Sequence, residues 1–134
     1  KVLMLLRVNN PAKGQWWVPG GRVLKGEKLV EAVKRKVLEE VGFEVEIKKQ
    51  VGTYETIFNN GPFPDLKSGV HAVNVCFLTV PKRNNFKIIL DKTNSDYKWI
   101  NKIDEDLSEY CHDNNNYILA LKTSLENRMQ ELAM

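Results

Sequence analysis

The chain has 134 residues, with 20 Lys and Arg against 17 Asp and Glu, which gives a formal net charge of +3. This length suits one domain with a single core, and 43% hydrophobic and 28% charged residues are typical of an ordinary globular protein. Scattered basic residues argue against a nucleic-acid-binding protein, and no apolar run approaches the roughly 20 residues that span a bilayer.

The beginning of the chain and its cysteines bear on domain organisation and location. Lys1 stands inside an apolar run, without an initiator Met or a signal-peptide pattern, so we expect further residues upstream of this single domain (1–134). Cys76 and Cys111 lack metal-type spacing, and we expect two reduced thiols in a cytoplasmic protein rather than a disulfide.

The first predicted element is a strand over residues 2–8 (VLMLLRV), whose nearly continuous apolar run is typical of a central strand buried on both faces. Arg7 near its end is either a buried arginine, which needs an anionic partner, or part of an exposed strand end. A turn at 9–14 and a short strand at 16–18 follow. Pro19, Gly20 and Gly21 then break the strand, and two glycines let the backbone approach a ligand closely.

A helix is predicted from Glu27 to about Val41, with Gly26 as its N-cap and Gly42 as the stop after its last turn. One face carries a valine stripe that can pack on a sheet: Val30, Val33, Val37 and Val41. The opposite, hydrophilic side carries Glu27, Glu31, Arg35, Glu39 and Glu40.

The remaining chain predicts mostly strands. We expect strands at 44–58, with a bulge or bend at Gly52, and at 70–80, 86–90 and 97–100, with a polar loop at 91–96. The loop at 59–69 is a candidate lid or specificity loop. A short helix is expected at 103–111 and an amphipathic helix at about 116–132. The pattern indicates one mixed sheet flanked by two helices, and hence a single α+β sandwich.

The glycine turn and the acidic helix together suggest a metal and diphosphate site. Mg²⁺ prefers oxygen ligands, often one or two carboxylates with waters and phosphates, and Glu39, Glu40 and the Gly20 carbonyl offer such atoms. The guanidinium groups of Arg7 and Arg22 are suited to diphosphate oxygens. A glutamate pair alone is usually a solvated helix face, but the combination with the glycines and arginines favours the functional interpretation.

The same residues resemble the Nudix box, G-x5-E-x7-R-E-U-x-E-E-x-G-U, where U is bulky and apolar. Eight of nine fixed positions match over 23 residues: Gly21, Glu27, Arg35, Val37, Glu39, Glu40, Gly42 and Phe43. The resemblance implies the Nudix-type α/β/α sandwich, with a mixed sheet between helices. It also implies a substrate in which a nucleoside diphosphate is linked to another group, and Mg²⁺ or Mn²⁺ as the cofactor.

Lys36 is the one mismatch, because it stands where the family has a glutamate. In most Nudix pyrophosphatases this glutamate helps to bind metal or activates the attacking water, and a lysine cannot bind metal. Lys36 lies three residues before Glu39 and four before Glu40, so we expect its ammonium near their carboxylates. We expect fewer metal ions in the site as a result, and the mismatch argues against ordinary P–O cleavage.

One Nudix subgroup, the GDP-mannose mannosyl hydrolases, tolerates the loss of this glutamate and resembles the chain beyond the box. The similar segments are Arg7 with Asn9, 11–12, Gly14, Trp16, 18–23, His71, Asp96-Tyr97 and Trp99. The resemblance implies cleavage of the glycosyl C–O bond with inversion, release of GDP and free sugar, and a homodimer. It implies catalytic residues Arg35, Glu39 and Glu40, substrate contacts Arg7, Arg22 and His71, and metal ligands Gly20, Glu39 and Glu40.

The chain departs from this subgroup at Thr93 and Asn94, where the subgroup has a metal-binding glutamine and a histidine base. Asn94 cannot accept a proton at neutral pH. His71, Asp91 and Asp96 are other candidate bases, and Glu55 is a further candidate metal ligand. Several aromatic residues could stack a base or sugar or simply pack in the core: Trp16, Trp17, Tyr54, Phe58 and Phe63.

Three functions therefore stay open. The first is an Mg²⁺-dependent hydrolase that cleaves the glycosyl C–O bond of a GDP-mannose-like nucleotide sugar. The second is a pyrophosphatase that cleaves a P–O bond of a nucleotide sugar or related compound. The third is a non-catalytic module that binds nucleotide sugars, which the residues at Lys36 and Asn94 would favour.

Overall fold

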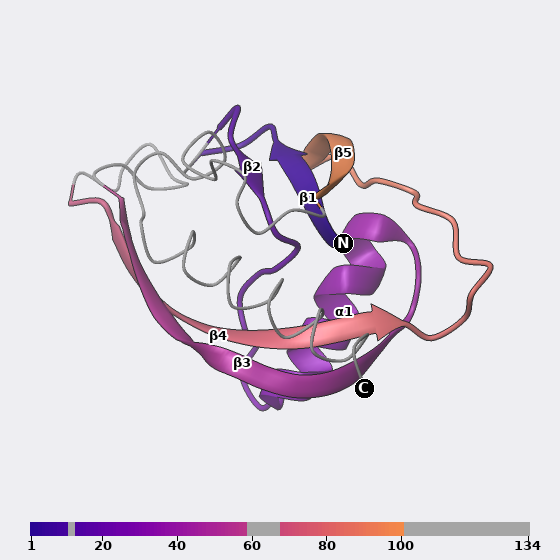
Figure 1. Ribbon diagram of the computed structural model, residues 1–134. Helices are drawn as coiled ribbons and strands as arrows, with labels where there is room; N and C mark the ends of the chain where they lie inside the picture. Colours follow the sequence, from indigo (N-terminus) through magenta and orange to yellow (C-terminus); the bar gives the residue numbers. More distant parts are fainter. Residues whose placement is uncertain (11–12, 59–67, 101–134) are drawn as a thin grey trace.

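The computed structural model describes residues 1–10, 13–58 and 68–100 (Figure 1). The elements follow in the order β1 (Val2–Arg7), β2 (Trp16–Trp17), α1 (Leu29–Val41), β3 (Val45–Phe58), β4 (Val70–Pro81) and β5 (Asn94–Ile100). The helices expected at 103–111 and 116–132, most of the expected lid at 59–69, and Cys111 lie outside these residues, whereas Cys76 is a free thiol. No helix within the described residues is both long and apolar enough to cross a membrane.

The described strands form two antiparallel sheets, of order β2-β1-β5 and β3-β4. β1 is the central strand of the first sheet, and Leu3, Met4 and Leu5 are buried, as the apolar run predicted. The register between β3 and β4 shifts between Gln50 and Gly52, which confirms the predicted bulge. The α+β class is confirmed, and every strand pair among the described residues is antiparallel.

The core lies where α1 packs between β1 and the β3–β4 hairpin (Figure 1). Its buried residues come from β1, α1 and β3: Leu3, Leu5, Val37, Val41 and Val45. Val33 is partly buried against this cluster, but Val30 is 39% exposed, so the predicted valine stripe reaches the core only after the first turn of the helix. The packing holds the last turn of α1 against β1.

The predicted N-terminal end of the helix was wrong, and its C-terminal end is confirmed. Lys28 is the N-cap, with extended backbone, and its N–H donates to the Glu31 carboxylate at 3.0 Å. Gly26 has a φ of +81° and belongs to the preceding turn. Gly42 ends the helix with a φ of +80°, and its N–H donates to the Leu38 carbonyl at 3.0 Å.

The strand predicted at 86–90 was also wrong. The Ile89 N–H donates to the Val41 carbonyl at 2.8 Å, and the Asp91 N–H donates to the Glu40 carbonyl at 3.2 Å. These donors therefore satisfy the free carbonyls at the end of α1 instead of pairing in a sheet. The last strand begins at Asn94, inside the predicted polar loop and three residues before the predicted start at Tyr97.

Candidate functional site

The last turn of α1 carries two adjacent carboxylates in different environments. Glu40 is 7% exposed, although the helical pattern predicted it on the hydrophilic side, whereas Glu39 is exposed. The Gly20 N–H donates to Glu40 Oε2 at 3.0 Å. This bond fixes the glycine turn on the helix, as the sequence suggested. In this structure Gly20 contacts Glu40 through its N–H rather than through the carbonyl expected to bind metal.

Glu40 is electrostatically unusual. Burial raises its pKa from 4.5 to about 7, against the lowering effects of the Gly20 N–H, Lys36 and Arg7, while Asp91 raises it further. Arg7 and Asp91 are therefore close enough to Glu40 to change its charge state. A divalent cation binds the deprotonated form and would release a proton from this carboxyl.

Lys36 lies on the carboxylate pair, as its spacing predicted. Its Nζ is 3.2 Å from Glu39 Oε2 and 3.9 Å from Glu40 Oε1. Its methylene stem passes directly over Gly21, whose lack of a side chain leaves room for it. A positive charge thus stands where the Nudix box has a third carboxylate.

Arg35 organises the loop before the helix. Its Nε and Nη2 donate to the two carboxylate oxygens of Glu27 at 2.7 and 3.0 Å. Nη2 also donates to the Arg22 carbonyl at 2.9 Å, and Nη1 donates to Glu39 at 3.2 Å. A bidentate pair of this kind fixes geometry as well as charge. In this structure Arg35 positions the loop and Glu39, and Arg22 enters the network through its backbone carbonyl.

The Glu27–Arg35 pair predicts how the protein responds to acid. The hydrogen bond from Arg35, together with the Leu24 N–H, lowers the Glu27 pKa from 4.5 to about 2. A lowered pKa stabilises the fold above pH 4.5, and this contribution is lost as the pH falls towards 2. At pH 7 we expect the urea midpoint of wild type to be higher than that of Glu27→Gln, and we expect this difference to shrink between pH 4.5 and 2.5.

Glu46→Gln is the control, because it removes an exposed carboxylate on β3. If the difference between wild type and Glu27→Gln stays constant down to pH 2.5, the stabilising role given to the Glu27–Arg35 pair is contradicted.

Thr93 and Asn94 face Asp91 rather than the helix carboxylates. Asp91 Oδ1 accepts hydrogen bonds from the Thr93 N–H at 3.1 Å, the Thr93 hydroxyl at 2.6 Å and Asn94 Nδ2 at 3.4 Å. Because the Asp91 N–H binds the Glu40 carbonyl, this network places a fixed carboxylate next to the end of α1. Of the candidate bases, Asp91 is therefore the one that the structure brings to Glu40.

His71 lies elsewhere on the surface, on β4. Its Nε2 is 2.6 Å from Glu55 Oε2 on β3, and both side chains are more than half exposed. In the part of the chain that the structure describes, this pair belongs to the β3–β4 sheet, whereas Glu39 and Glu40 belong to α1. Within the same residues, no group of three His, Cys, Asp or Glu side chains is arranged to hold a metal ion. The two helix carboxylates match in number and kind what Mg²⁺ takes from a protein.

Three of the aromatic candidates make contacts within the protein: Trp16, Trp17 and Phe58. Trp17 is buried and lies 5.9 Å from the Phe58 ring, centroid to centroid. The Lys98 ammonium lies 4.3 Å above the Trp16 ring. Phe63 lies outside the described residues.

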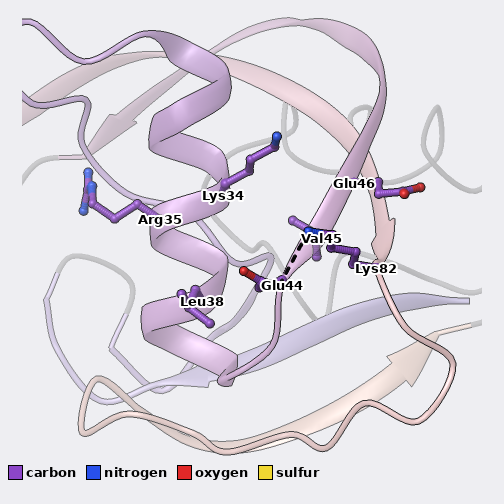
Figure 2. Close-up of a pocket in the computed structure, with 7 residues that line it drawn as sticks. All are labelled: Lys34, Arg35, Leu38, Glu44, Val45, Glu46 and Lys82. Atoms are coloured by element: carbon purple, nitrogen blue, oxygen red, sulfur yellow. Dashed lines mark ion pairs between the residues drawn. The ribbon is translucent and has the colours of Figure 1, made fainter.

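A hollow on the surface is separate from this arrangement of carboxylates. Figure 2 shows the hollow between α1, the start of β3 and the end of β4, with the Lys82–Glu44 ion pair of 3.8 Å at its edge. Its lining combines acidic and basic side chains with two apolar ones: Lys34, Arg35, Leu38, Glu44, Val45, Glu46 and Lys82. Neither Glu39 nor Glu40 lines it, so the hollow does not extend the candidate metal site.

Comparison with known proteins identifies a family. The NUDIX domain family pattern matches residues 1–119. A low-salt glycan biosynthesis protein, Agl8, of Haloferax volcanii is 40% identical over 67 residues, which are 50% of this chain and 43% of that protein. An ADP-ribose pyrophosphatase of Methanocaldococcus jannaschii is 36% identical over 78 residues, 58% of this chain and 42% of that protein. The chain thus spans less than half the length of these relatives.

Solved structures show the same fold. The MutT protein of Methanosarcina mazei superposes with a TM-score of 0.66 and 20% identity, over 98% of this chain and 85% of that one. A bifunctional NMN adenylyltransferase/ADP ribose pyrophosphatase of Francisella tularensis, complexed with AMP and a Mn ion, gives a TM-score of 0.55 and 19% identity. The second match covers 94% of this chain and 37% of that chain.

Proposed function

Because this chain belongs to the NUDIX domain family, we propose that it is an Mg²⁺- or Mn²⁺-dependent hydrolase of a nucleoside diphosphate sugar. The substrate class is GDP-mannose-like, and the bond cleaved is the glycosyl C–O bond, which gives GDP and free sugar. The observation that carries the proposal is the Lys36 ammonium, 3.2 Å from Glu39. It stands where a third box carboxylate would bind metal or activate water for attack on phosphorus.

The proposed site assigns a role to each predicted residue. Glu39 and Glu40 hold the cation, with the Gly20 carbonyl as a further ligand. When bound, the cation stabilises the charge that develops on the departing diphosphate. Arg7, which lies close enough to Glu40 to lower its pKa, and Arg22 contact the diphosphate oxygens. His71 stays a predicted substrate contact, which would have to reach the substrate from β4, where it pairs with Glu55. Arg35 holds the loop and Glu39 in place through its bonds to Glu27 and the Arg22 carbonyl.

The proposed reaction is a displacement at the anomeric carbon. A water oxygen forms a bond to this carbon while the bond from carbon to the diphosphate oxygen breaks, and GDP leaves with the electron pair. The proton of the water goes to a general base, for which Asp91 is the candidate because its backbone is bonded to Glu40. A carboxylate can accept this proton, whereas the Asn94 amide cannot.

A second candidate function is pyrophosphatase chemistry, which the similarity to the ADP-ribose pyrophosphatase favours. Hydrolysis in ¹⁸O-water separates the two functions, since C–O cleavage labels the free sugar and P–O cleavage labels a phosphate. With Mg²⁺ and a panel of nucleoside diphosphate sugars, we expect label in the sugar, read by mass spectrometry. Label in phosphate would show that the protein cleaves a P–O bond, which is the second candidate function, and would rule out the proposed reaction.

The same panel tests the third possibility, a module that binds without catalysis. Release of neither sugar nor phosphate, with retained binding of the nucleotide sugar in calorimetry, would identify such a module. The proposal also includes a homodimer, which the resemblance to the subgroup implies, and a cytoplasmic location, which the two cysteines suggested. Analytical ultracentrifugation checks the dimer independently of the chemistry.

A further inference from the structure

We propose that Lys36 is a tethered cation that occupies the carboxylate pair in the metal-free protein, and that a divalent ion has to displace it in order to bind. This inference rests on the proposed metal site and adds a regulatory element to it. Its direct support is the position of Lys36 Nζ, 3.2 Å from Glu39 Oε2 and 3.9 Å from Glu40 Oε1. One ammonium thus faces both carboxylates to which the cation is assigned.

The path of the Lys36 stem explains how the ammonium reaches this position. A Cβ built on Gly21 would lie 2.6 Å from Lys36 Cδ and 3.0 Å from Cγ, and closer still to Cε. Because glycine has no side chain, it leaves room for the Lys36 stem to lie directly over it. Gly21 does not have a positive φ, so alanine fits its backbone and would collide only with the lysine side chain.

The other cation of the network cannot take the same role. Arg35 also contacts Glu39, but its Nε and Nη2 are held by Glu27 and by the Arg22 carbonyl. Lys36 has a compact charge on a flexible stem and no such bidentate anchor. We infer that Arg35 stays in place when a metal enters and that Lys36 swings away. The cation then binds more weakly than two adjacent carboxylates would otherwise allow, and it is released more readily.

The charge of Lys36 is tested with Lys36→Met, which keeps an apolar stem of similar length. With Mn²⁺ alone as the probe, we expect Lys36→Met to bind about tenfold more tightly than wild type, because the ion no longer has to displace the ammonium from its contacts with Glu39 and Glu40, and two partly exposed ion pairs are worth about that much. Free Mn²⁺ is read by electron paramagnetic resonance. Lys34→Met is the matched control, since it removes the same charge from an exposed site on α1, and its affinity should stay within about twofold of wild type.

Gly21→Ala tests the same inference without touching a charge. We expect the added methyl group to move the ammonium and to tighten Mn²⁺ binding several-fold. In a Lys36→Ala background the same substitution should have no further effect, so the double-mutant cycle measures the coupling. Additive effects, or equal Mn²⁺ affinity in wild type and Lys36→Met, overturn the tethered-cation role while leaving the metal site intact. Failure of all variants to bind Mn²⁺ overturns the metal site itself and, with it, the proposed function.

Discussion

Glu40→Gln is expected to lower kcat for cation-dependent hydrolysis on the order of 10³-fold while leaving the fold intact. The amide keeps the shape of the side chain but removes the negative charge to which we assign the cation. Charge stabilisation by a bound metal is worth several kcal/mol, and each 1.36 kcal/mol is a factor of ten in rate. Initial rates of sugar release at saturating Mg²⁺ measure the effect. Glu44→Gln is the control, because it removes an exposed carboxylate outside the site.

The stability of Glu40→Gln separates loss of chemistry from loss of structure. Burial raises the Glu40 pKa to about 7, so the stability that comes from the neutral carboxyl is present below pH 4.5 and lost as the pH rises through about 7. At pH 8 and without metal, the buried Glu40 carboxylate of wild type is charged, whereas the glutamine side chain of the variant is neutral. We therefore expect the urea midpoint of Glu40→Gln at pH 8 to equal or exceed that of wild type. Full activity in this variant, or a lower midpoint at pH 8, would contradict the role given to Glu40.

Local sequence patterns predicted the elements that carry the site. The spacing of valines and glutamates predicted α1, and Gly42 predicted where it ends, because a left-handed stop depends on a single residue type. The spacing of three and four residues also placed Lys36 on Glu39 and Glu40. These features involve interactions within one or two helical turns, which sequence periodicity describes well.

What the sequence did not predict depends on contacts between distant segments. Glu40 is buried because the glycine turn and the 89–91 segment both bond to the last turn of α1. The 86–90 segment has the composition of a strand, but the Ile89 N–H donates to the Val41 carbonyl at the end of the helix. The next bond, from the Asp91 N–H to the Glu40 carbonyl, brings Asp91 to Glu40. Periodicity contains no information about such long-range pairing. The sequence could therefore name Asp91 as a candidate base but could not predict that it lies near Glu40.

The ion pairs of the site form one series of alternating charges, which runs from Glu27 through Arg35, Glu39 and Lys36 to Glu40. Each cation is shared between two carboxylates, so the two cations balance two of the three carboxylates before a metal arrives. The two ends of this series differ in geometry. The Glu27–Arg35 end is bidentate and holds the loop, whereas the Lys36–Glu40 end is a single, longer contact of 3.9 Å.

Gly42→Ala should be strongly destabilising although it leaves every charge of the site in place. Gly42 has a φ of +80°, where an L residue costs about 1–2 kcal/mol. A Cβ there would lie 2.9 Å from Ile89 Cβ and 3.2 Å from the Ile89 carbonyl oxygen, and overpacking adds about 1–3 kcal/mol. We expect the free energy of unfolding in urea to fall by about 2–5 kcal/mol in total.

Gly26→Ala is the matched control for this prediction. Gly26 has nearly the same φ, +81°, but a Cβ there meets nothing within 4 Å, so only the backbone cost of about 1–2 kcal/mol applies. The additional loss in free energy of unfolding in Gly42→Ala, compared with Gly26→Ala, then measures the contact between residue 42 and the 89–91 segment. Because this segment bonds to Val41 and Glu40, Gly42→Ala should also weaken Mn²⁺ binding, whereas Gly26→Ala should not. Equal losses of stability in the two variants would show that the segment yields freely and does not help to hold Glu40 in place.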